Sequence, residues 1–128
     1  MPFSYYVDEA TRVLHVDAAG AVDDAQLLEL VIRLRREPAL ITGYPILCNC
    51  SAVTSVMISA VMIESLARAG RARTNFVAVI APSAIAFGLA RMYQIFCDPE
   101  DARIHVFANS EEAMGWLGTA IAGLPLHA

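Results

Sequence analysis

Short apolar runs that alternate with helix-like repeats constrain the fold of this chain more than any other feature. Residues 44–50 and 75–81 form two continuous apolar runs of strand length. Runs of this kind are typical of strands that are buried on both faces of a sheet. A helical repeat follows each run, and alternating strands and helices place the strands parallel in one sheet. The sequence therefore predicts an α/β fold with a mostly parallel central sheet and helices packed on it.

The N-terminal segment departs from this alternation, because two strand-like stretches follow each other directly. Residues 3–8 and 12–17 are rich in aromatic and β-branched side chains, and a short polar break separates them. Such a pair is typical of an antiparallel hairpin. With a last strand at 103–107, the predicted order is ββαβαβαβα, and we expect residues 1–128 to form one domain.

Capping signals mark the starts of three of the helices. Asp23 and Gln26 have the spacing of a capping box, in which each side chain bonds the other residue's backbone N–H. Ser83 is the expected cap of the third helix, and 109–112 is a second capping box before the last helix. The first helix then carries an apolar stripe, and Pro38 ends this helix. The stripe consists of Leu27, Leu30, Val31 and Leu34.

The second and third helices carry broader apolar surfaces. The predicted core stripe of the second helix is Ile58, Val61, Met62, Ser65, Leu66 and Ala69. That of the third helix is Ile85, Leu89, Met92 and Phe96. Additional apolar side chains extend the surface of the third helix past one face: Phe87, Ala90, Tyr93 and Cys97. A helix this apolar is buried on a second side, against a partner chain, a ligand or deeper core packing.

The overall apolar content is high for a chain of this length. Hydrophobic residues make up 57% of the 128 residues, and the mean hydropathy is +0.52. The longest candidate for a membrane span, residues 76–96, is interrupted by Pro82, Gly88 and Arg91, and the N-terminus does not resemble a signal peptide. We expect a soluble, cytoplasmic domain whose surplus apolar surface forms a dimer interface or a ligand cavity.

Residue types that carry chemistry are few and scattered. Cys48 and Cys50 alternate in a predicted strand, so both thiols point to one face, and no histidine or cysteine accompanies them at metal-ligand spacing. Paired acidic residues fall at helix starts or in a loop, and no nucleophile elbow or glycine-rich phosphate loop is present. The net charge is −4 and no basic cluster pairs with aromatic residues, which argues against nucleic acid as a partner. We therefore expect a non-enzymatic protein without a metal or cofactor.

Three segments, together with the order of elements, resemble the STAS domains and specifically the SpoIIAA-like (STAS/SEC14-type) bacterial proteins. The segments are Leu-Cys-Asn-Cys-Ser-Ala-Val-Thr at 47–54, the strand at 76–81 leading into Phe-Gly-Leu-Ala-Arg-Met-Tyr-Gln at 87–94, and the strand at 104–107 leading into the helix with Trp116 and Leu117. In anti-sigma-factor antagonists of this type a phosphorylated serine opens the second helix. The resemblance places Ser59 at that position, but the acidic residue before it and the glycine after it are absent.

Two functional hypotheses follow. The first is a regulatory protein-interaction module of STAS type that forms a homodimer through the third helix. Its apolar binding or dimer surface would consist of Phe87, Arg91, Met92 and Tyr93. Ser59 is its candidate phospho-acceptor. The alternative, which the SEC14-type side of the resemblance implies, is a small carrier for an apolar or lipid-like ligand. Lipid that stays bound during purification would distinguish the carrier from the interaction module.

Overall fold

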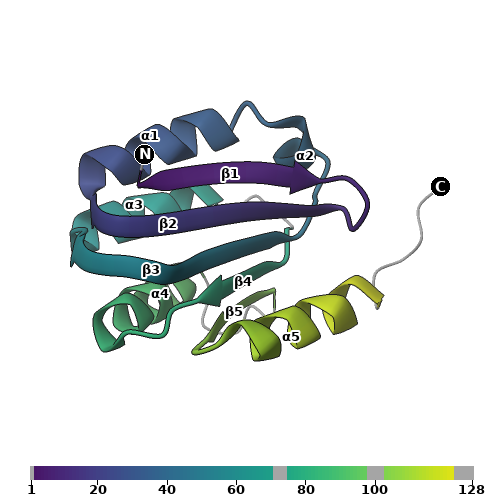
Figure 1. The fold of residues 1–128 in the computed structure, drawn as a ribbon. Helices are drawn as coiled ribbons and strands as arrows, with labels where there is room; N and C mark the ends of the chain where they lie inside the picture. The colour runs from purple at the N-terminus through teal and green to yellow at the C-terminus, as the bar shows by residue number, and fades with distance from the viewer. Residues whose placement is uncertain (1, 71–74, 98–102, 123–128) are drawn as a thin grey trace.

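The computed structural model describes residues 2–70, 75–97 and 103–122, and a five-stranded sheet lies at its centre (Figure 1). The strand order in space, β1-β2-β3-β4-β5, is also the order along the chain. β1 is antiparallel to β2, and the other neighbours are parallel, which confirms the predicted sheet. The strands are β1 Phe3–Asp8, β2 Val13–Asp23, β3 Ile46–Met57, β4 Val77–Ile80 and β5 Ile104–Phe107.

Helices cover the two faces of the sheet unequally. α1, α3 and α4 lie behind the sheet in Figure 1, whereas α5 packs on the opposite face. A short helix, α2, was not predicted; it begins at Pro38, whose missing N–H and fixed φ suit the first position of a helix. The helices are α1 Asp24–Leu34, α2 Pro38–Ile41, α3 Ala60–Gly70, α4 Ala84–Cys97 and α5 Ser110–Ala122.

The register of the parallel strands decides which side chains share a face. Val16, Cys48 and Val79 are register partners on β2, β3 and β4, and they point toward α1, α3 and α4. Their neighbours Leu47 and Ala78 point the other way, toward α5. Because side chains alternate along a strand, this register gives the sheet two separate apolar layers.

The predicted caps are present. Asp23 accepts a hydrogen bond from the N–H of Gln26 at 2.9 Å, and the Gln26 side chain accepts one from the N–H of Asp23 at 3.0 Å, which completes the capping box. Ser83 Oγ accepts from the N–H three residues later at 3.1 Å, and Asn109 does the same for α5 at 2.9 Å. These bonds satisfy backbone donors that have no partner inside the helix.

Both long strands continue beyond their predicted ends. β2 runs to Asp23 because Gly20 adopts a positive φ of 71° and the pairing with β3 shifts register before Ala19 and again after Gly20. Such irregularities let a strand bend and continue pairing. β3 likewise runs on to Met57, where exposed residues such as Ser51, Thr54 and Ser55 interrupt the apolar pattern and the half-buried Val53 and Val56 still face the core.

The predicted core stripes of α3 and α4 are wrong at several positions. Val61 and Ile85 are 73% and 66% exposed, and Ser65 and Ala69 are also exposed, whereas Ile63 and Ala67 are buried. Both helices are apolar on more than one side, so periodicity alone does not identify the inward face. Met62, Leu66, Leu89, Met92 and Phe96 do pack against the core as predicted.

Gln94 is a polar residue of α4, yet it is only 8% exposed. Its Nε2 donates a hydrogen bond to the carbonyl oxygen of Ile104 at 2.6 Å, and its Oε1 accepts one from Arg91 at 2.8 Å. These two bonds satisfy the amide, which is what permits its burial. The bond to Ile104 also connects α4 to β5.

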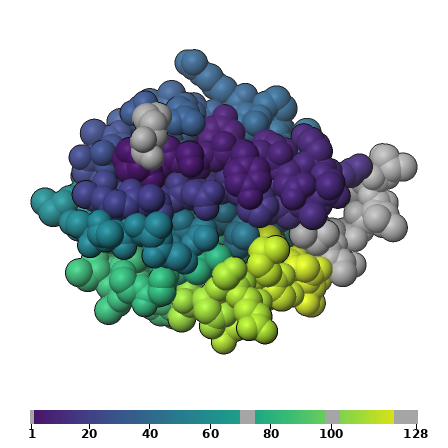
Figure 2. All heavy atoms as spheres, viewed as in Figure 1, coloured from purple at the N-terminus to yellow at the C-terminus, as the bar shows by residue number. Residues whose placement is uncertain are grey.

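The face of the sheet that carries α5 is only partly covered. Figure 2 shows β1 and β2 uncovered on this side, whereas α5 lies over the lower part of the sheet. Tyr6 and His15 are register partners there, and their rings stack with centroids 4.6 Å apart while Tyr6 is 55% exposed. The helix-free part of this face is therefore polar and aromatic, in contrast to the apolar opposite face.

Candidate functional site

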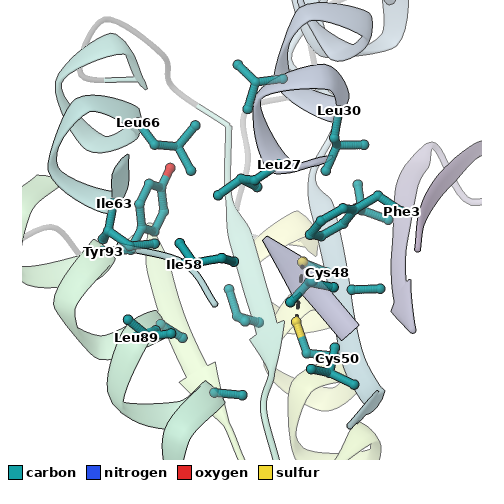
Figure 3. A pocket seen from close by; sticks show the side chains of 18 of the residues that line it. Phe3, Leu27, Leu30, Cys48, Cys50, Ile58, Ile63, Leu66, Leu89 and Tyr93 are labelled. Carbon is teal, nitrogen blue, oxygen red and sulfur yellow. Dashed lines mark hydrogen bonds between the residues drawn. The ribbon is translucent and has the colours of Figure 1, made fainter. Parts of the chain in front are cut away.

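An apolar cavity of about 210 Å³ lies between the sheet and the three helices α1, α3 and α4. Figure 3 shows side chains from all three helices and from β1 and β3 converging on it. Its walls are almost entirely hydrocarbon, and residues that line it include Phe3, Leu27, Leu30, Ile63, Leu66, Leu89 and Tyr93. An engineered apolar cavity of about 150 Å³ stays dry and binds benzene, so this space exceeds what a single aromatic ring needs.

Small side chains on the sheet and on α4 leave this space open. Ala86 and Ala90 lie one turn apart on the cavity side of α4, and Ala18 lies on the cavity side of β2. A one-carbon side chain at each of these positions does not reach across the gap between the layers. Larger side chains from α1 and α3 line the remaining walls, and the volume between them stays unfilled.

Two thiols and a phenol supply the polar atoms of the cavity walls. Cys48 and Cys50 point into the cavity from the same face of β3, as the sequence predicted, and their Sγ atoms are 3.9 Å apart (Figure 3). The hydrogen bond between them raises the pKa of Cys48, which burial raises further. The same bond stabilises the Cys50 thiolate and lowers the pKa of Cys50, against the opposing effect of burial.

Ser59 joins the N-termini of two helices that flank the cavity. Its Oγ accepts a hydrogen bond from the N–H of Met62 at 3.1 Å, so Ser59 caps α3. Its N–H and its hydroxyl both donate to the carboxylate of Asp24, the first residue of α1, at 2.8 Å each. We call this pair of bonds the Asp24–Ser59 latch. It ties α3 to α1 beside Ile58, which lines the cavity.

The residues predicted as a surface of the third helix do not share one face. Tyr93 lines the cavity, and Met92 packs against the same core. Phe87 is half-buried against Val79 and neighbouring residues. Arg91 is exposed. The structure thus places Tyr93 in the wall of the cavity, while a binding or dimer surface on α4 remains a prediction.

Residues 2–70, 75–97 and 103–122 contain no group of three or more His, Cys, Asp or Glu side chains placed to hold a metal ion. None of the helices in these ranges combines the length and the apolar character that crossing a bilayer requires. The sequence predicted a binding or dimer surface on the third helix, and of the four residues predicted for it Tyr93 lines the cavity. Alanines on the inward side of α4 were an available signal, but alanine is also the commonest helix former and so the signal is weak.

The fold defines the class of protein: a small α/β domain whose parallel sheet is extended by one antiparallel edge strand. Among solved structures it is similar to an uncharacterized protein of the DUF3478 family with a SpoIIAA-like fold from Shewanella loihica PV-4. The two share 16% sequence identity, with a TM-score of 0.59 over 90% of this chain and 91% of the other. The SpoIIAA-like fold predicted from sequence is therefore confirmed. No protein-family model and no curated protein matches the chain.

Proposed function

We propose that this protein is a non-enzymatic, cytoplasmic binding protein or carrier for a small apolar or lipid-like molecule, which it holds in the cavity between the sheet and α1, α3 and α4. The observation that supports this most is the size of the cavity. The space of about 210 Å³ is partly open to solvent, so its hydrocarbon walls stay in contact with water when it is empty. An apolar occupant would remove that surface from water, which is favourable.

The lining defines the chemistry of that occupant. Burial of a ligand's apolar surface against hydrocarbon side chains contributes about 25 cal/mol of binding free energy per Å². The same side chains offer no hydrogen-bond or ionic partner for a charged group. Tyr93 and the two thiols are the polar groups of the wall. The ligand should therefore be largely hydrocarbon, such as an acyl chain or a ring system, with at most a weakly polar end.

Extraction of the purified protein tests the proposal directly. Native mass spectrometry should detect a bound apolar molecule that organic solvent removes, and an uncharged fluorescent probe, N-phenyl-1-naphthylamine, should bind the stripped protein with one-to-one stoichiometry. Leu30→Trp, which enlarges a wall residue, should weaken probe binding, whereas Leu28→Trp on the exposed side of α1 should not. Failure of the stripped protein to bind any apolar probe would contradict the function proposed here.

Phosphorylation at Ser59 fits the same proposal as a means of control. A phosphate on the Ser59 hydroxyl would remove its hydrogen bond to Asp24 and would place two negative groups side by side. The Asp24–Ser59 latch would then separate, which frees the start of α3 from α1 next to the cavity. Probe dissociation measured with and without the modification tests this role.

A regulatory interaction with another protein, or with a second copy of the chain, is the second candidate. Leu28 and Ile32 are one turn apart on α1 and both are exposed, as are Met57 and Val61 near the start of α3. Apolar side chains grouped on a helix favour a protein contact. Sedimentation analysis of Ile32→Glu against the wild type tests a homodimer, since a charge at that contact would dissociate it while leaving the fold intact.

A further inference from the structure

The spacing of the two cavity thiols is fixed by the sheet. Cys48 is on β3, the middle strand, with Val16 of β2 and Val79 of β4 as its register partners. Cys50 follows two residues later, so its side chain extends from the same face. Both sulfurs line the cavity, and Figure 3 shows them facing each other at its floor. The pair is therefore a preformed dithiol within an apolar enclosure.

The distance between the sulfurs decides what this dithiol is suited to. A disulfide needs the sulfurs about 2.05 Å apart, so the observed 3.9 Å would have to shrink by nearly half within one strand of a paired sheet. A single soft metal or metalloid atom can instead bond to both sulfurs near their observed separation. With bonds of about 2.3 Å to each sulfur, 3.9 Å corresponds to an S–M–S angle of roughly 115°. A planar three-coordinate centre fits this angle as it stands, and a trivalent centre with a lone pair, which is pyramidal, needs the two sulfurs slightly closer together, a far smaller shift than a disulfide requires.

A third substituent on such a centre would extend into the cavity. The described residues place no third Cys, His, Asp or Glu beside the pair to complete a metal cluster. The surrounding wall is hydrocarbon from Leu27, Leu30 and Ile63 among others. The third substituent that this wall would accommodate is therefore an apolar organic group rather than a charged or hydrated one.

We propose that Cys48 and Cys50 form a two-thiolate site for a soft metalloid or metal centre that carries an apolar organic substituent, with organoarsenic(III) compounds as the type ligand. This inference rests on the proposed function, because the organic substituent occupies the same cavity. Thiolates prefer soft centres, and the enclosure adds selectivity for an apolar body.

Binding is a ligand exchange that needs neither oxidant nor reductant. With phenylarsine oxide, two arsenic–sulfur bonds form as the arsenic–oxygen bond breaks. The oxygen leaves as water with the two thiol protons, and arsenic stays trivalent. The adduct therefore gains one phenylarsenic group and loses two hydrogen atoms, a change that mass spectrometry resolves. Two sulfurs on one rigid strand also hold the centre far more tightly than one does.

The test uses phenylarsine oxide, arsenite and the uncharged probe N-phenyl-1-naphthylamine on the full chain. Cys48→Ser and Cys50→Ser each remove one sulfur, and Cys97→Ser is the matched control, since Cys97 lies outside the cavity near Ala67. We expect one equivalent of phenylarsine oxide on the wild type and on Cys97→Ser, in competition with the probe and resistant to excess glutathione. Each cavity variant should bind it about 100-fold more weakly while still binding the probe.

Each other result has a definite meaning. Undiminished binding to Cys48→Ser or Cys50→Ser overturns the two-thiolate site. Equal affinity for arsenite and phenylarsine oxide overturns the selection for an apolar substituent. If the probe binds but phenylarsine oxide does not, the inference fails and the proposed function stands. If the probe does not bind the wild type, the proposed function fails, and with it the cavity on which the inference rests.

Discussion

Filling the cavity from within should raise stability and abolish ligand binding at the same time. Ala90 lines the cavity from α4, and leucine at this position adds three carbon atoms that extend into the empty space. Burial of a methylene contributes about 0.8 kcal/mol, so Ala90→Leu should stabilise the ligand-free protein by about 2 kcal/mol. For a chain of this length, that gain raises Tm by roughly 7 °C.

Thermal unfolding by circular dichroism and titration with N-phenyl-1-naphthylamine measure the two effects. Ala84→Leu is the matched control, because Ala84 is exposed at the start of the same helix and does not line the cavity. We expect Ala84→Leu to resemble the wild type in both assays. A lower Tm for Ala90→Leu together with unchanged probe affinity would refute the reasoning, because leucine would then have met packed atoms instead of open space.

Three further predictions concern hydrogen bonds. Gln94→Ala leaves a carbonyl of β5 without its donor and should cost about 1 to 3 kcal/mol in urea unfolding; an unchanged midpoint would show that the bond is not needed. Ser59→Glu should speed probe dissociation more than Ser59→Ala does, because both remove the cap, worth about 1 kcal/mol, but only glutamate repels Asp24; equal rates would exclude a role for charge. Cys48→Ala removes the donor that lowers the pKa of Cys50, so the midpoint of Cys50 alkylation against pH should move upward and its rate at neutral pH should fall; a downward move would contradict the assigned direction of that bond.

Local signals in the sequence were sufficient to predict the architecture. The capping box at Asp23 and the apolar runs on β3 and β4 depend on backbone geometry within a few residues, and the structure reproduces them. The continuation of β2 past Gly20 depends on pairing with β3, a strand that is distant in sequence. Its exposed residues therefore carried no strand signal of their own.

The candidate site was predicted only in outline, because it depends on volumes that no local pattern records. Excess apolar surface on α4 predicts a second contact for that helix, which stays a prediction, and Tyr93 lines the cavity. Ala90, which leaves the space open, reads as an ordinary helix residue. The Asp24–Ser59 latch joins residues 35 positions apart, so the sequence offered Ser59 as a cap or an acceptor of phosphate but did not indicate its partner.

The strand order has a consequence for how the chain is made. Each strand pairs with the one that precedes it in sequence, so every strand that emerges from the ribosome finds its neighbour already in place. The cavity, unlike the sheet, is not completed by neighbours in sequence. The residues that line it range along the chain from Phe3 to Tyr93, so it remains incomplete until α4 has been synthesised. A hydrophobic molecule that meets the nascent chain before that moment would be surrounded as the chain folds, so biosynthesis offers a route of loading in addition to exchange with the folded protein.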